Sequence, residues 1–279
     1  MTLKVIDYTM LNTFLTCRKL YWWRMVRGLV LNRPQTAPEF GRCIHKALDV
    51  WYVDRDVKEA IEVFNAEFKE NPEDDKRTKE VAAKMLELYD AQYKDQNWKV
   101  LATELEFTLP IPETDYALIG RMDKVIDWDG AIYVVDHKTT SRLGAEFFKM
   151  GKPNMQFDGY TWAAETLGFK PCSGVVIDAL LVAKGLLVAA QRSKLTPVAR
   201  DISTRSEEDI RRYLRRVPCI VKDIEQCYKS DMWYENTGSC TDYGECPYRM
   251  LCMEDESLRD RIVAAEYKVE RWEPRKETL

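Results

Sequence analysis

The chain has 279 residues, of which 46% are hydrophobic and 32% are charged, and its net charge at neutral pH is −4. A chain of this size can bury a substantial core. Its balanced charge excludes a globally basic, histone-like nucleic-acid binder, although local basic patches remain open. No run approaches about 20 apolar residues, and the N-terminus lacks the features of a secretory signal. We therefore expect a cytoplasmic protein without a membrane segment, whose eight cysteines serve a purpose other than disulfide bonding.

The first third of the chain is predicted to be helical. Apolar residues recur at helical spacing over 7–27, and further helices are expected over 42–52, 57–69 and 77–96. Two prolines within 30–40 predict a loop there.

The middle of the chain changes to the pattern of extended strands. Residues 101–109 alternate between apolar and polar side chains, and strands over 116–128 and 131–138 follow, joined by an Asp-Gly turn. This pattern predicts an antiparallel meander. Beyond it we expect a helix over 154–167, a strand over 174–184, a second strand over 185–193 that pairs with it, and a long helix. That last helix starts near Ser206 as N-cap and runs toward Tyr228, with Pro218 as a possible kink.

Charged residues stand at the ends of the predicted strands. Asp136 and Lys138 share one face of their strand and His137 faces the other way. If the three strands are neighbours, Asp123 and either Glu104 or Glu106 converge with them. Clustered carboxylates need a cation between them, and hard oxygen ligands suit Mg²⁺ or Mn²⁺. A metal with a lysine beside it suits phosphodiester hydrolysis, although Asp-x-Lys taken alone is better explained by a salt bridge at a strand end.

The segment GRMDKVIDWDGAIYVVDHKTT resembles the core of the RecB-type branch of the PD-(D/E)XK nuclease superfamily. That core has the pattern Gly-x-x-Asp, then an apolar strand that ends in Asp-x-Lys-Thr. Gly120, Asp123, Asp136, Lys138 and Thr139 stand at the matching positions. The upstream acid of the family corresponds to the first glutamate of ELEF, which is Glu104.

Two further motifs agree with this resemblance. FGRCIHKAL resembles the family's Gly-x-x-x-His helix and contains His45, while QFDGY resembles its Gln-x-x-x-Tyr motif and contains Gln156 and Tyr160. Taken alone, His45 would be an ordinary packed or solvent-facing residue, and QFDGY an ordinary helix flank. Their order along the chain, from about residue 7 to 253, matches the family throughout.

The resemblance implies a role for each of these residues. His45, Asp123, Asp136 and the backbone carbonyl of His137 would bind the catalytic metal. Glu104 would assist with a second ion or a water, and Lys138 would position the attacking water and stabilise charge. Gln156 and Tyr160 would support the site or contact the DNA strand.

Four cysteines form a separate pattern. Cys17 lies in the first predicted helix, and Cys240, Cys246 and Cys252 follow with the spacing C-x5-C-x5-C. Four thiolates can bind an iron–sulfur cluster or zinc, and this spacing is too wide for a zinc-ribbon knuckle. The pattern resembles the iron–sulfur subgroup of RecB-type nucleases, which includes the AddB nuclease domain and the CRISPR adaptation exonucleases. The usual trio is C-x2-C-x5-C, and Tyr243 stands where its first cysteine is expected, so Cys240 would have to reach the cluster from further away.

The implied fold is α/β and restriction-endonuclease-like, with a mixed central sheet flanked by helices. We expect one domain over 1–279: a helical part over 1–100, the sheet core over 101–193 and a helical part over 194–279. A 4Fe–4S cluster, with zinc as the alternative, would join the two helical parts.

The implied function is that of a metal-dependent DNA nuclease. It would act as an exonuclease that processes DNA ends in recombination, repair or phage replication. The basic and aromatic run over 17–28 suits single-stranded DNA, whereas a second arginine run over 205–216 is equally explained as a solvated face. Any helicase or recombinase would be a separate chain. The alternatives are a non-catalytic nucleic-acid-binding module organised by an iron–sulfur or zinc site, and a redox protein whose working part is the cluster.

Overall fold

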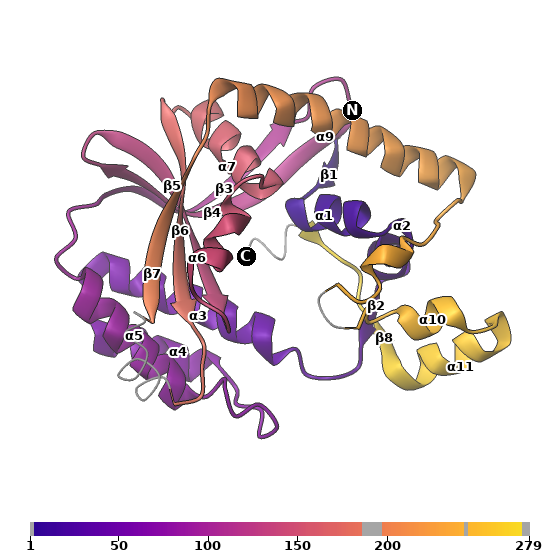
Figure 1. The fold of residues 1–279 in the computed structure, drawn as a ribbon, viewed down its shortest axis with the longest axis horizontal. Helices are drawn as coiled ribbons and strands as arrows, with labels where there is room; N and C mark the ends of the chain where they lie inside the picture. The colour runs from indigo at the N-terminus through magenta and orange to yellow at the C-terminus, as the bar shows by residue number, and fades with distance from the viewer. Residues whose placement is uncertain (1–2, 186–196, 243–244, 275–279) are drawn as a thin grey trace. The chain divides into compact units, whose positions relative to one another are not determined.

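The computed structural model describes residues 3–185, 197–242 and 245–274 (Figure 1). By its internal contacts the chain divides into two compact units made of discontinuous segments. We call the first the terminal unit, which comprises Met1–Arg33, Glu106–Arg121 and Arg211–Leu279, and the second the central unit, which comprises Pro34–Leu105 and Met122–Ile210. The single nuclease domain over 1–279 and its three parts stay a prediction.

The described residues form a six-stranded mixed sheet with the path β1-β4-β5-β6-β7, and β3 also pairs with β4. β1 runs parallel to β4, β4 antiparallel to β5, β5 parallel to β6, and β6 antiparallel to β7. The strands are β1 Lys4–Ile6, β3 Lys99–Pro110, β4 Tyr116–Trp128, β5 Ala131–Thr140, β6 Cys172–Leu181 and β7 Val198–Thr204. A mixed α/β fold with a central mixed sheet, as the sequence predicts, is thereby confirmed.

Helices cover both faces of the sheet in the central unit (Figure 1). One face contacts α5, because Tyr89 hydrogen-bonds Asp178 of β6. The other face contacts the segment before α7, because Ser203 of β7 donates to the carbonyl of Gly151 at 2.7 Å. These helices are α3 Thr36–Asp54, α4 Val57–Glu67, α5 Lys79–Tyr93, α6 Ala145–Phe148, the 3₁₀ helix η2 Lys149–Gly151 and α7 Met155–Thr166. The buried apolar sides of α3, α4 and α5 form the main core with β4, β5 and β6.

The N-terminal helices differ from the prediction in two places. The segment 7–27 is broken into α1 Tyr8–Thr16, α2 Arg18–Tyr21 and a π-helix, η1 Trp22–Val26, because Cys17 adopts an extended conformation (φ −165°, ψ 126°). α3 begins at Thr36 rather than at 42, since Pro38 lies in its first turn, where no backbone N–H is needed.

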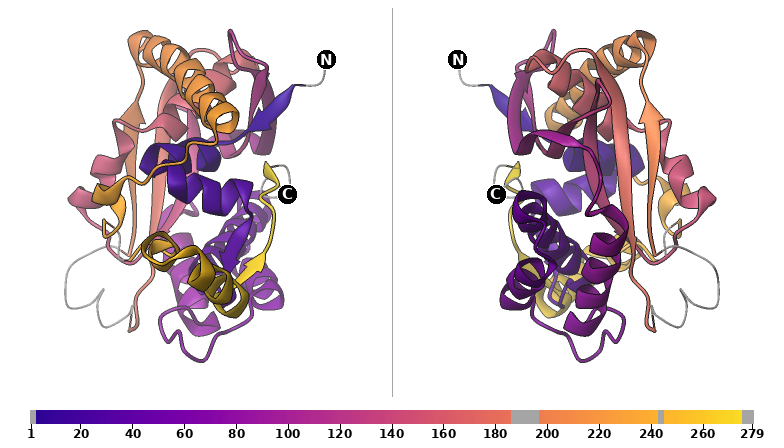
Figure 2. Two further views of the ribbon diagram at one scale, coloured as in Figure 1. Left: turned by 90° about the vertical axis from the view of Figure 1, so that its right-hand side faces the viewer. Right: turned by 90° about the vertical axis from the view of Figure 1, so that its left-hand side faces the viewer.

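The terminal unit brings the two ends of the chain together. β2 Leu29–Leu31 pairs antiparallel with β8 Tyr267–Val269, and the two strands lie side by side in Figure 2. The phenol of Tyr248 donates to the carbonyl of Leu29 at 2.6 Å, within a small core that also contains Trp23 and Leu251. The remaining C-terminal elements are the 3₁₀ helix η3 Thr237–Ser239, α10 Arg249–Met253 and α11 Glu256–Glu266.

The long helix α9 spans Glu207–Ser230 and continues through Pro218. Ser206 is its N-cap, as predicted: its Oγ accepts from the backbone N–H of Asp209 at 3.2 Å, and Asp209 accepts from the N–H of Ser206 at 2.9 Å. This reciprocal pair is a capping box. The strand predicted over 185–193 lies outside the described residues except at 185, and the observed antiparallel partner of β6 is β7.

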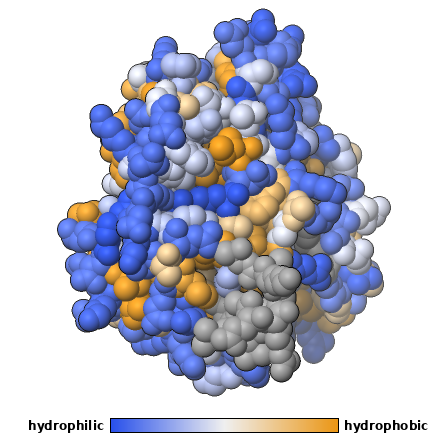
Figure 3. Space-filling view, turned by 60° about the vertical axis from the view of Figure 1, so that its left-hand side comes forward, coloured by the Kyte–Doolittle hydropathy of each residue, from blue (hydrophilic) through white to orange (hydrophobic). Residues whose placement is uncertain are grey.

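The surface is polar over most of the face drawn in Figure 3, where hydrophobic side chains gather in separate patches. Among the described helices, none has the length and apolar character needed to cross a membrane.

Candidate active site

Strands β4 and β5 bring two aspartates together. The strands pair in antiparallel register from Lys124–Val135 to Trp128–Ala131, which leaves Asp123 beside the polar end of β5. There Asp123 Oδ2 accepts a hydrogen bond of 2.8 Å from the backbone N–H of His137. The side chain of Asp123 is 13% exposed and that of Asp136 is 4% exposed. Both carboxylates therefore lie largely out of water, at the point where the two strands separate.

Lys138 follows Asp136 by two residues on β5, so the two side chains project from the same face of the strand. Its Nζ is 2.8 Å from Asp136 Oδ2 and 3.0 Å from Oδ1, and its side chain is 27% exposed. The salt bridge that Asp-x-Lys alone would predict is therefore present. The amine nevertheless stays accessible to solvent, so it can also contact a bound molecule.

His45 reaches this cluster from α3. Its Nδ1 lies 3.4 Å from Asp123 Oδ1. One turn earlier, a Cβ on Gly41 would lie only 3.2 Å from Thr139 Oγ1 of β5. The glycine of the Gly-x-x-x-His motif therefore lets α3 approach β5 closely, and the histidine one turn later meets Asp123.

The pKa values of the two aspartates shift in opposite directions. Burial raises the pKa of Asp136, and the charge of Asp123 adds to this, while Lys138 opposes it. Burial would also raise the pKa of Asp123, but the nearby His45 and His137 more than offset it and hold the pKa well below its usual range. For His45 burial lowers the pKa, yet the charge and hydrogen bond of Asp123 leave it raised. Such divergence between neighbouring carboxyls is typical of functional sites.

The donor set of this cluster fits a divalent cation in its chemistry. Asp136 Oδ2 is buried and accepts no well-aligned hydrogen bond, although Lys138 lies near it. Two carboxylates and an imidazole suit Mg²⁺ or Mn²⁺. As they stand, however, no three His, Cys, Asp or Glu side chains in the described part of the chain are arranged to hold a metal. Because Asp123 pairs with His45 and Asp136 with Lys138, side chains would have to rotate before three of them shared one ion.

The other predicted site residues lie on neighbouring elements. Glu104 is on β3, the strand next to β4, and its φ of +47° marks an irregularity that the alternating pattern did not predict. Glu106, the other candidate, belongs to the terminal unit and is exposed. On α7, which packs against β5 and β6, Gln156 Nε2 donates to the hydroxyl of Tyr160 at 3.0 Å. The two motif residues of this helix therefore form one polar unit.

Comparison with known proteins agrees with this arrangement. The family model described as PD-(D/E)XK nuclease superfamily matches residues 7–253. The chain belongs to the PD-(D/E)XK nuclease superfamily. No curated protein sequence matches the chain. Among solved structures, it is similar to the crystal structure of SSO0001, with 13% identity and a TM-score of 0.35, covering 79% of this chain and 87% of that one. So distant a likeness carries no functional argument.

Behind the nuclease motif lies a buried polar network that the sequence analysis missed. His137 faces away from Asp136, and its Nδ1 is 3.2 Å from Asp178 Oδ2. Asp178 is fully buried and pairs with Arg200, whose Nε lies 3.1 Å from Asp178 Oδ1. The hydroxyls of Tyr52 and Tyr89 complete the network, 2.8 Å apart. Burial lowers the pKa of His137, and the positive charge of Lys124 lowers it further. A lone aspartate within the apolar strand GVVIDALL was the available signal.

The four cysteines predicted to act together all belong to the terminal unit of this superfamily member. Cys17 Sγ accepts from the N–H of Asn236 at 3.2 Å, and the N–H of Cys246 donates to the carbonyl of Cys240 at 3.0 Å. Burial raises the pKa of Cys246 and of Cys252, and neighbouring cysteines, including Cys17, raise both further. The thiols are therefore within electrostatic reach of one another, although within the described residues no metal-binding arrangement is formed. Tyr243 lies outside the described residues.

The predicted single-strand-binding run over 17–28 makes its contacts mainly within the protein. Lys19 Nζ lies 4.4 Å from the ring centre of Trp22, Arg24 lies 4.9 Å from that of Trp272, and Trp23 is buried. The second basic run, the arginines over 205–216, is not solvent-exposed at its first residue. Arg205 is buried and pairs with Asp158 at 2.6 Å.

Proposed function

We propose that this superfamily member is a metal-dependent deoxyribonuclease that hydrolyses phosphodiester bonds, acting as an exonuclease at DNA ends and forming one nuclease domain over 1–279. The observation that supports it most is the meeting of Asp123, Asp136 and Lys138 beside His45 in the central unit. Superfamily membership supports nuclease chemistry and the general use of divalent metals.

In this proposal His45, Asp123 and Asp136 hold a Mg²⁺ or Mn²⁺ ion, together with the backbone carbonyl of His137. When bound, the ion would supply Lewis-acid stabilisation of the scissile phosphate. Glu104 would help to hold a water or a second ion from β3.

Lys138 has a separate task in the same proposal. Its accessible ammonium, anchored by Asp136, would orient the attacking water and stabilise the charge that develops on the phosphoryl oxygens. Gln156 and Tyr160, hydrogen-bonded to each other on α7, would support the lysine or contact the DNA backbone. The buried ring of His137, which faces Asp178, would keep the end of β5 in place beneath both aspartates.

The terminal unit would carry a 4Fe–4S cluster, or zinc, on Cys17, Cys240, Cys246 and Cys252. The cluster would act as a staple between the two ends of the chain, because hydrolysis needs no redox chemistry. The ligand chemistry of four thiols in one unit, and the electrostatic influence of Cys17 on Cys246 and Cys252, support this assignment. With such a cluster the chain would belong to the iron–sulfur subgroup of RecB-type nucleases, and would be similar to the AddB nuclease domain and the CRISPR adaptation exonucleases.

The proposed substrate is DNA that is single-stranded or has accessible ends, encountered in the cytoplasm during recombination, repair or phage replication. A helicase or recombinase partner would act as a separate chain.

One experiment tests the nuclease function. End-labelled single- and double-stranded DNA is incubated with anaerobically purified protein in Mg²⁺, Mn²⁺ or EDTA, and the products are separated by length. We expect metal-dependent shortening from an end, which Asp136→Ala and Lys138→Ala reduce by at least roughly 100-fold while DNA binding persists. Lys149→Ala, which removes a lysine that is 71% exposed in the same unit, serves as the matched control and should cut like the wild type.

The second candidate is a non-catalytic nucleic-acid-binding module. It is favoured by the lack, among the described residues, of a three-ligand metal arrangement. In that case the wild type binds DNA but leaves it uncut in every metal, and the nuclease proposal is wrong.

A further inference from the structure

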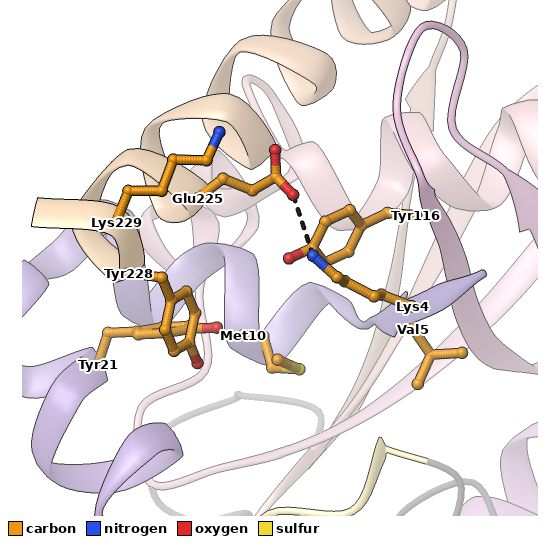
Figure 4. A pocket seen from close by; sticks show the side chains of 8 residues that line it. All are labelled: Lys4, Val5, Met10, Tyr21, Tyr116, Glu225, Tyr228 and Lys229. Atoms are coloured by element: carbon orange, nitrogen blue, oxygen red, sulfur yellow. Dashed lines mark hydrogen bonds and ion pairs between the residues drawn. The ribbon is translucent and has the colours of Figure 1, made fainter. Parts of the chain in front are cut away.

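A pocket of about 490 Å³ lies in the terminal unit, and none of its lining residues belongs to the candidate active site (Figure 4). Five elements line it: β1, α1, α2, the first part of β4, and the last turns of α9. The lining residues are Lys4, Val5, Met10, Tyr21, Tyr116, Glu225, Tyr228 and Lys229. Its volume falls within the range of pockets for small organic ligands.

The pocket has an aromatic wall that is already held in place. In Figure 4 the rings of Tyr21 and Tyr228 lie on one side, and Tyr116 lies on the other. Tyr228 is 50% exposed, and its ring meets Trp233 edge-on at 5.1 Å. Trp233 in turn stacks on the buried Tyr21 at 5.8 Å. Because these contacts fix the Tyr228 ring, a flat ligand could stack on it at little cost in side-chain entropy.

The rim of the pocket carries more positive than negative charge. Lys4 Nζ lies 3.1 Å from Glu225 Oε1 and 5.1 Å from the ring centre of Tyr116. Lys229 lies one turn after Glu225 on α9 and is exposed. Because the rim has two lysines and one glutamate, it favours an anionic ligand. The aromatic wall favours a flat one.

We propose that this pocket is a subsite for one unpaired nucleotide of single-stranded DNA. The base would stack on Tyr228 above the apolar side chains of Val5 and Met10, and its phosphate would contact Lys229. This combination of aromatic and cationic side chains is the general way in which proteins hold single strands. The identity of the ligand rests on the proposed nuclease function. A base held in this way must be unstacked, so the subsite distinguishes single strands and frayed ends from blunt duplex.

The test measures the binding of a fluorescent oligothymidylate of roughly 12 nucleotides by anisotropy, in EDTA so that no cleavage occurs. Tyr228→Ala should weaken binding by about 5- to 150-fold, whereas Tyr228→Phe, which keeps the ring, should bind like the wild type. Lys229→Ala should lower the slope of log affinity against log salt concentration by about 0.7. Lys222→Ala, which removes an exposed lysine of the same helix outside the pocket, is the matched control and should leave both quantities unchanged.

Three results would overturn the subsite. The first is that Tyr228→Ala binds the oligothymidylate as tightly as Lys222→Ala does. The second is that Tyr228→Phe loses as much affinity as Tyr228→Ala. The third is that Tyr228→Ala weakens binding to blunt duplex DNA as much as binding to the single strand. Circular dichroism of each variant checks that the fold persists. Failure of the nuclease function has a different signature, because the wild type would then leave DNA uncut in Mg²⁺ and Mn²⁺ while the difference between Tyr228→Ala and Lys222→Ala in EDTA remained.

Discussion

Asp123 and Asp136 carry the same side chain but have opposite pKa shifts. Asp123 is held by His45 and by the N–H of His137, so its charged form is favoured. Asp136 is more deeply buried, and burial together with the charge of Asp123 outweighs the attraction of Lys138, so its pKa is raised. An incoming cation would meet one carboxylate that is firmly ionised and one whose charge it would itself stabilise.

Asp178 provides a prediction about stability. Asp178→Asn leaves Arg200 buried with its charge uncompensated, so we expect the free energy of unfolding to fall by about 3 kcal/mol in urea denaturation followed by circular dichroism. Asp75→Asn is the matched control, because Asp75 forms an exposed pair with Lys184 whose side chains are 60% and 71% exposed. The control should change stability by less than about 1 kcal/mol. Equal effects in the two variants would show that the buried network contributes no special stability.

At the scale of elements, β5 links the site to the core. One of its faces presents Asp136 and Lys138, and the other presents His137 to the network around Asp178. Close approach of its neighbours depends on small residues, as Gly41 shows for α3. Gly120 does the same where β3 and β4 lie together, since a Cβ there would come within 2.6 Å of the Phe107 ring. The two motif glycines thus have packing reasons that the pattern alone does not reveal.

The N-terminus of α9 provides a prediction about pH. Hydrogen bonds from Lys152 and from Ser206 lower the pKa of Asp209. A lowered pKa in the folded state adds stability above the unfolded pKa of about 4, and this stability is lost as the pH falls through the folded value. We expect Asp209→Asn to cost about 1 kcal/mol at neutral pH, and the difference from the wild type to shrink below about pH 4.

Urea denaturation at a series of pH values measures this difference. Asp223→Asn is the control on the same helix, because Asp223 is 63% exposed and lies 3.7 Å from Arg18. A difference between wild type and Asp209→Asn that stays constant down to acidic pH would contradict the proposed cause.

At the scale of the molecule, the terminal unit is assembled from segments at both ends of the sequence. β2 and β8 pair across it, and Cys17 and the C-terminal cysteines lie in it together. Joining residues so far apart is entropically costly, and a bound cluster or zinc ion would offset this cost because metal binding stabilises only the folded arrangement.

The staple can be tested through colour and thermal stability. Anaerobically purified wild type should be brown, and Cys17→Ser or Cys246→Ser should lose the visible absorbance and lower the melting temperature by several degrees. Cys219→Ser is the control, since Cys219 is an exposed thiol of α9 and is not one of the four predicted ligands. Colourless wild-type protein with bound zinc would select the alternative metal, and protein without either would contradict the staple.

Much of the fold could be predicted from local sequence patterns, whereas much of the site could not. The bounds of β4 and the cap at Ser206 match their predictions, because side-chain alternation and capping act between residues close in sequence. The early start of α3 was missed because prolines usually predict a loop, yet Pro38 fits a first turn. The partner of Asp178 could not be predicted, since Arg200 lies on another strand and only the sheet register brings the two together.

The amino-acid sequence by itself determined the type of most elements and the order of the nuclease motifs, because these depend on periodicity and on residues near one another in the chain. Only the tertiary structure decided that His45 reaches Asp123, that His137 turns toward a buried ion pair, and that tyrosines from two helices and one strand line a pocket. Each of these contacts joins residues far apart in sequence, so it depends on how whole elements pack rather than on any local preference.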